Sequence, residues 1–206
     1  MTLDTGIFTR RNLPHLNYPR GTYFITYRLH DSLPLNLVLE LKKKYENSAE
    51  EPSIREKRIF KKYDDLLDKG SVLGKINLTN TEMSEINQRI IHRYDGQDYF
   101  LICYCIMPNH IHLAFTLLEG NRGISKIMKS IKGISAREYN KLMGTNGIIW
   151  QDESYDHLVR NEQELLNIIR YIINNPVNAK FVTDWKNWKW TYVAQNSFCA
   201  LDMLKI

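Results

Sequence analysis

The sequence lacks several features that would place it in a special class of protein. None of its apolar runs approaches the ~20 residues that a membrane-spanning helix requires. Its first residues do not combine a basic start with an apolar segment, as a secretory signal does. It has only three cysteines, of which Cys103 and Cys105 share a predicted strand face and Cys199 is distant. We therefore expect a cytoplasmic protein that contacts no membrane and keeps its thiols reduced.

The composition is typical of an ordinary globular protein, with 43% hydrophobic and 25% charged residues. A chain of 206 residues is long enough for one domain with a substantial core. No internal repeat, low-complexity tract or clear domain boundary interrupts it. We therefore expect a single domain over residues 1–206.

The spacing of apolar residues predicts an α+β fold. Alternating patterns indicate strands over 22–30, 98–106 and 110–118 and an extended segment over 148–159. Helical spacing indicates helices over 35–45, 54–68, 80–93 and 121–143, and one more that begins at Asn161. We expect this last helix to stop before Pro176, because the residue before a proline is disfavoured in the helical conformation. The irregular alternation of strands and helices favours a mostly antiparallel sheet.

Acidic residues are nearly absent from the helix predicted over 121–143. Its only acid is Glu138 against six lysines and arginines, and this excess of five positive charges equals the net charge of the whole chain. A helix face that meets only solvent normally mixes both signs, so a surface that contacts phosphates explains the pattern better. The candidate DNA-binding residues are Arg122, Lys126, Lys129, Lys132, Arg137 and Lys141.

Two histidines, His110 and His112, stand two residues apart in a predicted strand. Residues two apart in a strand point to the same face, so Ile111 between them should enter the core on the other face. Two neutral imidazoles on one face can hold a divalent metal ion. The alternative is that one or both are half-buried strand residues without a ligand, and the spacing alone does not decide between these interpretations.

A second candidate group lies in the helix before Pro176. Tyr171 and Asn175 are four residues apart and therefore share one helix face. A tyrosine near a helix end is usually a packing residue, and the chain has twelve tyrosines. Spacing alone therefore does not join Tyr171 to the histidines.

Three separate motifs resemble those of a known family. They are Tyr104–Leu113 (YCIMPNHIHL), Trp150–Arg160 (WQDESYDHLVR) and Tyr171–Ala179 (YIINNPVNA). In order and spacing they are similar to the REP-associated tyrosine transposases, the single-tyrosine HUH transposases of bacteria. The resemblance covers most of the chain, from about residue 10 to residue 192.

The resemblance implies a role for each matching residue. His110 and His112 correspond to the metal-binding histidines, Tyr171 to the nucleophile, and Asn175 to an amide that completes the metal site. The implied cofactor is Mg²⁺ or Mn²⁺, although histidine ligands alone would also permit zinc. His157 has two interpretations, a third metal ligand or a hydrogen-bonded histidine of the sheet, and the second is favoured. Trp150 is expected to pack beside the active site.

The implied fold is a ferredoxin-like sandwich. A central antiparallel sheet would carry the His-x-His motif, with helices on the other face. Residues 35–69 would then form a charged helical insertion and residues 183–206 a C-terminal tail. For the tryptophans of this tail, packing is favoured over the stacking of DNA bases.

The implied activity is metal-dependent nicking and joining of single-stranded DNA through a 5′-phosphotyrosine intermediate. The DNA would form hairpins from palindromic repeats, and the protein would act as a monomer or homodimer. Two alternatives stay open at this point. One is a domesticated DNA-binding protein of the same fold, and the other is a metal-dependent phosphodiesterase that uses water.

Overall fold

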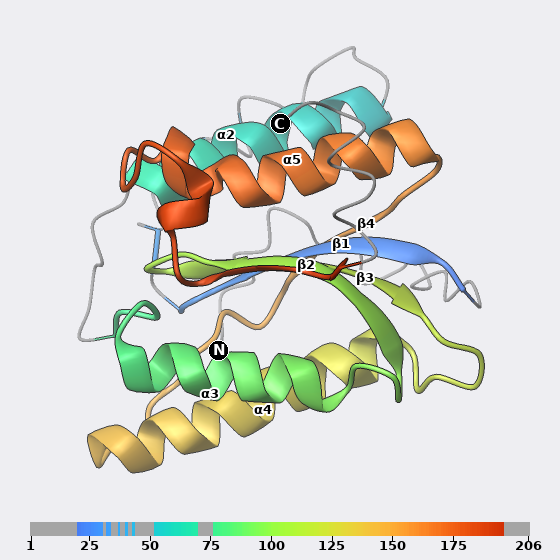
Figure 1. The fold of residues 1–206 in the computed structure, drawn as a ribbon. Helices are drawn as coiled ribbons and strands as arrows, with labels where there is room; N and C mark the ends of the chain where they lie inside the picture. Colours follow the sequence, from blue (N-terminus) through green and yellow to red (C-terminus); the bar gives the residue numbers. More distant parts are fainter. Residues whose placement is uncertain are drawn as a thin grey trace.

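A five-stranded antiparallel sheet forms the centre of the protein (Figure 1). The computed structural model describes residues 20–30, 32–33, 37, 40, 43, 52–69 and 76–195. The strands follow the order β4-β1-β3-β2-β5 across the sheet, and each neighbouring pair is antiparallel. In chain order the elements are β1 (Thr22–Arg28), α2 (Pro52–Lys69), α3 (Thr81–Arg93), β2 (Tyr99–Ile106), β3 (His110–Leu117), α4 (Ile124–Met143), β4 (Tyr155–Leu158), α5 (Glu162–Asn178), the short 3-10 helix η1 (Trp185–Asn187) and β5 (Thr191–Val193).

Four strands and two helices make up a ferredoxin-like unit. α3 follows β1 and leads into β2, and α4 connects β3 to β4, so the chain runs βαββαβ. The expected α+β sandwich, with a central antiparallel sheet that carries the histidines, is therefore confirmed. α2 lies in the connection between β1 and β2, and α5 and β5 follow the unit.

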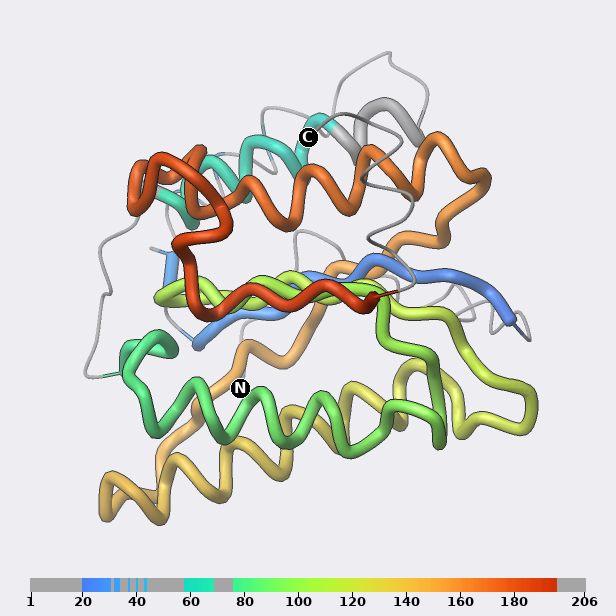
Figure 2. The backbone as a smooth tube through the Cα atoms, viewed as in Figure 1, coloured from blue at the N-terminus to red at the C-terminus, as the bar shows by residue number. Residues whose placement is uncertain are grey.

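Helices cover both faces of the sheet. α3 and α4 lie side by side on one face, and α2 and α5 lie on the other (Figures 1 and 2). The first pair provides the helices that were expected on the face away from the histidines. The second pair buries the histidine face as well, which the sequence analysis had not predicted.

Alternate residues of each strand enter different cores. Ile111 of β3 packs with Ile90 of α3 and Ile127 of α4. Ala114, on the other face of β3, packs with Ile172 of α5. The strict period of two along the strand thus separates the two layers of the core.

The expectation that the last helix would stop before Pro176 is wrong, because α5 continues to Asn178. A proline lacks the backbone N–H and so removes one helical hydrogen bond, the bond to the carbonyl four residues earlier. Here that loss falls in the last turn, and the backbone N–H of Ala179 still donates to the Asn175 carbonyl (2.9 Å). Asn175 therefore remains helical and keeps its place one turn after Tyr171.

The remaining predicted elements are close to those observed. The helices expected over 54–68, 80–93 and 121–143 correspond to α2, α3 and α4. The helix expected over 35–45 falls mainly outside the described residues, as does Cys199, whereas Cys103 and Cys105 are buried free thiols. Among the described residues, no helix is both long enough and apolar enough to span a membrane.

The described part of the C-terminal segment, residues 183–195, packs against the sheet edge through η1 and β5. The indole Nε1 of Trp188 donates to the carbonyl oxygen of Ile106 (3.0 Å), and Trp190 is buried in the core. The packing interpretation of these tryptophans is thus confirmed.

Ser135 of α4 connects this helix to the segment before β4, which gives a test of the packing. The buried Ser135 hydroxyl accepts a hydrogen bond from Trp150 Nε1 (2.8 Å). Ser135→Ala leaves a buried N–H without a partner, so we expect the free energy of unfolding to fall by about 1–3 kcal/mol. Urea unfolding followed by circular dichroism measures this loss. Ser125→Ala, at an exposed position of the same helix, is the control and should change stability by less than about 0.5 kcal/mol. Equal stability of the two variants would contradict the assignment.

Candidate metal and tyrosine site

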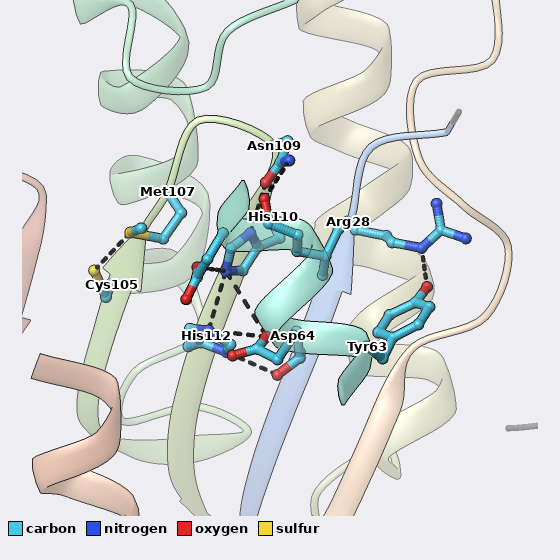
Figure 3. Close-up of polar contacts among 11 residues, drawn as sticks. Arg28, Tyr63, Asp64, Cys105, Met107, Asn109, His110 and His112 are labelled. Atoms are coloured by element: carbon cyan, nitrogen blue, oxygen red, sulfur yellow. Dashed lines mark hydrogen bonds and ion pairs between the residues drawn. The ribbon is translucent and has the colours of Figure 1, made fainter. Parts of the chain in front are cut away.

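His110 and His112 point toward each other and toward Asp64 of α2 (Figure 3). β3 presents them on one face of the sheet, as predicted, and both have an exposed fraction of 0%. Their Nε2 atoms lie 3.1 Å apart. The two rings therefore point their nitrogen atoms at one place, and neither is half-buried.

Neighbouring side chains fix the orientation of both rings. The amide Nδ2 of Asn109 donates to the Leu67 carbonyl oxygen (3.0 Å), so its Oδ1 is the atom that meets His110 Nδ1 at 2.7 Å. An amide oxygen only accepts hydrogen bonds, and therefore Nδ1 of His110 carries the proton and Nε2 carries the lone pair. The Thr26 hydroxyl holds His112 Nδ1 at 2.8 Å. Outer hydrogen bonds of this kind orient histidines that bind metal.

Two carboxylates of α2 complete the cluster, and neither was predicted from the sequence. Asp64 Oδ1 lies 3.5 Å from His112 Nε2 and 4.0 Å from His110 Nε2, and Asp68 Oδ1 lies 3.9 Å from His110 Nε2. Their spacing of four places them on one helix face, which is the only signal that the sequence offered. Residues 35–69 had been interpreted as a charged insertion, and only the docking of α2 reveals the contact.

Burial sets the protonation of these groups. It lowers the pKa of His110 to about 3 and that of His112 well below its usual range, so both imidazoles are neutral at pH 7 and available as ligands. Burial, with the neighbouring Asp68, raises the pKa of Asp64 well above its usual range. The pKa of Asp68 rises to about 7 for the same main reason. A nearby cation would favour the ionised form of both carboxylates.

The unsatisfied polar atoms of the site fit a divalent cation. One donor atom each from Asp64, His110 and His112 lie within 4.8 Å of one another. Asn175 adjoins the cluster, since its amide lowers the pKa of Asp64 and raises that of His110, yet neither its Oδ1 nor its Nδ2 makes a hydrogen bond of normal geometry among the described residues. Buried polar atoms without partners are rare and costly. A cation would satisfy the oxygen atoms of Asp64 and Asn175 and the free ring nitrogens.

Tyr171 stands beside this cluster. Its ring lies 5.4 Å from that of His112 and 5.9 Å from that of Phe24, measured between ring centroids. Its hydroxyl oxygen is buried and has no hydrogen-bond partner in the described part of the chain. α5 thus brings Tyr171 and Asn175 to the same histidine pair, which the shared helix face made possible and spacing alone did not show.

The basic residues of α4 lie on the opposite face of the sheet from the histidines. Arg122, two residues before α4, forms a bidentate ion pair with Asp98: its Nε lies 3.2 Å from Oδ1 and its Nη2 lies 2.6 Å from Oδ2. Lys132 Nζ donates to the Asp152 carbonyl oxygen (2.6 Å) and to Ser154 Oγ (3.2 Å). The four others have exposed side chains: Lys126, Lys129, Arg137 and Lys141.

His157 and Trp150, both in the second family motif, make structural contacts outside the metal cluster. His157 lies outside the metal cluster and pairs with Glu164, with 3.0 Å between Nε2 and Oε1, as the favoured interpretation expected. Trp150 does not pack beside the active site, which corrects that expectation. It lies on the α4 side of the sheet against Tyr27 and Tyr139, because the segment that leads to β4 starts at the end of α4 on that face.

Comparison with known families matches the part of the chain that carries these residues. A family described as "Transposase IS200 like" matches residues 74–175. The matched range includes both histidines, Tyr171 and Asn175, whereas α2 with Asp64 precedes it.

Individual relatives agree with this match. The chain is 27% identical over 111 residues to the REP-associated tyrosine transposase of Escherichia coli, covering 52% of this chain and 64% of that protein. It is 28% identical over 99 residues to a putative REP-associated tyrosine transposase of Haemophilus influenzae, covering 44% and 56%. The matched stretch thus spans somewhat more than half the length of these curated relatives. A solved structure described as a REP-associated tyrosine transposase bound to a REP hairpin has the same fold, with a TM-score of 0.56 and 18% identity over 87% of this chain and 80% of that one.

The position of Lys132 predicts a pH-dependent contribution to stability. Burial lowers its pKa to about 8 in the folded protein, against about 10.4 in an unfolded chain. Between these values the unfolded chain binds more protons at this residue, so folding becomes more favourable as the pH rises. The stability of the wild type relative to Lys132→Met should therefore increase by about 1–3 kcal/mol between about pH 7.5 and about pH 10.5. Urea unfolding at the two pH values checks this, with the exposed Lys126→Met as the matched charge control. A difference that does not change with pH would refute the prediction.

Proposed function

Because the chain belongs to the IS200-like transposase family, we propose that it nicks and rejoins single-stranded DNA through a covalent bond to Tyr171. The observation that carries the proposal is the approach of the Tyr171 ring to the buried histidine pair, 5.4 Å from the ring of His112. A nucleophile next to a site that suits a metal is the arrangement that covalent phosphoryl transfer requires.

We propose that His110, His112 and Asn175 hold Mg²⁺ or Mn²⁺, and that Asp64 supplies a further donor in the DNA-free protein. Mixed nitrogen and oxygen donors suit Mn²⁺, and Mg²⁺ prefers oxygen and keeps positions open for phosphate. When bound, the ion would neutralise charge on a non-bridging oxygen of the scissile phosphate.

The chemistry then falls to Tyr171. Its phenol has an ordinary pKa of about 10, so the phenolate costs about 4 kcal/mol at neutral pH before any help from the site. The phenolate oxygen forms a bond to phosphorus while the bond from phosphorus to the 3′ oxygen breaks, which leaves a 5′-phosphotyrosine and a 3′-hydroxyl. Attack by a 3′-hydroxyl on the phosphotyrosine reverses the step and joins two strands without a nucleotide cofactor.

We propose hairpin-forming single-stranded DNA as the substrate, since the solved relative with this fold is described as bound to a REP hairpin. Tyr171 meets His112 of its own chain, which supports a site complete within one monomer. The exposed basic residues of α4 lie on the other face of the sheet from Tyr171. They would therefore contact phosphates away from the scissile bond, such as those of the hairpin stem.

The nucleophile is tested by trapping the covalent adduct. Wild-type protein incubated with Mn²⁺ and hairpin-tailed single-stranded DNA should form a protein–DNA adduct that resists denaturant. Tyr171→Phe should form none, because it lacks the attacking oxygen, whereas Tyr192→Phe, on the other face of the sheet, should form adduct as the wild type does. Denaturing gel electrophoresis with labelled DNA measures the amount of covalent adduct. Cleavage without an adduct would favour the phosphodiesterase, and binding without cleavage the domesticated DNA-binding protein.

The histidine pair is tested by separating cleavage from binding. His110→Ala should lower the cleavage rate about a hundredfold or more, because charge on the phosphate is no longer offset in the transition state. DNA affinity should change little, since most phosphate contacts lie elsewhere. Cleavage assays, fluorescence anisotropy and Mn²⁺ titration followed by electron paramagnetic resonance give the three readouts. Equal losses of cleavage and DNA affinity, with Mn²⁺ binding intact, would count against the metal role.

A further inference from the structure

Helix α2 closes off the site that the proposed function requires. The side chains of His110 and His112 are fully buried, and so is the hydroxyl oxygen of Tyr171. α2 lies over this face of the sheet together with α5, and its Asp64 contacts the histidines (Figures 1 and 3). A phosphodiester therefore reaches the histidines only if α2 moves away.

Two side chains of α2 reach the site from one face of the helix, because Phe60 and Asp64 are four residues apart. The Phe60 ring stacks on Tyr155 of β4, with centroids 4.0 Å apart and planes inclined by 21°. Asp64 Oδ1 lies 3.5 Å from His112 Nε2. α2 thus presents a flat ring and a carboxyl group, which resemble in shape and placement the base and the phosphate of a nucleotide.

Tyr155 is in the right place to receive a base. Thr26 of β1 is opposite His112 of β3 on one side and Tyr155 of β4 on the other, so the three residues form one row across the sheet. Neighbouring strands are about 4.8 Å apart, which puts Tyr155 roughly 10 Å from His112 along this row. Phe24, next to Thr26 on the same face, contacts the rings of both Tyr155 and Tyr171. Tyr155 therefore lies two strands from His112, and the Phe24 ring alone separates it from the proposed nucleophile.

We propose that Tyr155 stacks on the base of a nucleotide beside the scissile phosphate, and that Phe60 and Asp64 of α2 occupy the base and phosphate positions in the DNA-free protein. The inference rests on the proposed function and extends it to recognition of the strand. Stacking on aromatic side chains holds single strands with little dependence on sequence, because every base has a flat face.

Two further polar contacts join described residues of α2 to β1 and to the turn before β3. Asn109 Nδ2 donates to the Leu67 carbonyl oxygen (3.0 Å), and Arg28 Nε donates to the Tyr63 hydroxyl. A DNA strand replaces the stacked ring of Phe60 by a base and the carboxyl group of Asp64 by a phosphate. Displacement of α2 costs these polar contacts, the approach of Asp68 to His110 and the apolar packing of the helix.

The test is an abasic scan of a hairpin-tailed single strand, read by fluorescence anisotropy in EDTA so that neither metal nor cleavage contributes. For wild type, loss of one particular base should lower affinity about tenfold. Tyr155→Ala should lower affinity for the intact strand by a similar factor and show no further loss at that position, since the two changes remove the same contact. Tyr155→Phe keeps the ring and should restore the wild-type scan.

Phe60→Ala should act in the opposite direction. It removes the competing ring without altering Tyr155, so we expect the DNA affinity to rise several-fold. Tyr192→Ala, a half-buried tyrosine near the opposite sheet edge, is the matched control and should leave the base dependence of the scan unchanged. Thermal unfolding shows that each variant is folded, and Tyr155→Leu replaces Tyr155→Ala if the latter does not fold.

Additive losses from Tyr155→Ala and the abasic position would overturn the stacking site. Unchanged or weaker DNA binding by folded Phe60→Ala would overturn the role of α2. Failure of the proposed function is distinguishable, because it appears as a wild-type protein that forms no adduct, whatever the scan shows. If the wild type forms the adduct but Tyr155→Ala and the abasic positions show no coupling, the proposed function is supported and the stacking role of Tyr155 is refuted.

Discussion

Successive side chains of β3 must point to opposite faces of the sheet, and β3 lies between β1 and β2 near the middle of that sheet. This constraint sends Ile111 into the core with α3 and α4 and sends both histidines to the other face. Since α2 and α5 cover that face, the imidazoles are removed from water and their pKa values fall. The geometry of one strand thus produces a pair of neutral rings suited to bind a cation.

The same burial leaves polar atoms near the histidines shielded from water and without hydrogen-bond partners in the described part of the chain. Asp64 and Asn175 also lie in this layer, and both have buried atoms without hydrogen-bond partners among the described residues. Buried polar groups persist where they serve a ligand or a reaction, because their desolvation is otherwise uncompensated. Hydrogen bonds with Asn109 and Thr26 hold the outer nitrogens of the rings, so the inner nitrogens face Asp64. The arrangement favours a metal site over an inert core.

The sequence predicted the fold and one half of the site well, because both depend on local periodicity. The shared face of His110 and His112 follows from a period of two, and that of Tyr171 and Asn175 from a period near four. The meeting of the two pairs depends on how α5 packs across the sheet, which no spacing encodes; the family resemblance suggested it. The contact of Asp64 with the histidines also depends on helix packing, here that of α2. The charged sequence of this helix is typical of a solvated surface, so it gave no sign of that contact. The extension of α5 past Pro176 was missed because the rule for proline applies less strictly in the last turn of a helix.

α2 covers the candidate site, but it lies outside the part of the chain that carries the histidines and Tyr171. The range that matches the transposase family begins at residue 74 and contains the histidines, Tyr171 and Asn175, whereas α2 lies before it. Phe60 and Asp64 belong to the segment before that range, which joins β1 to α3 outside the βαββαβ unit. A helix added in a connection can be altered or displaced without disturbing the register of the strands that present the histidines. The sheet and α5 present the histidines, Tyr171 and Asn175, whereas α2 adds Asp64 and covers them.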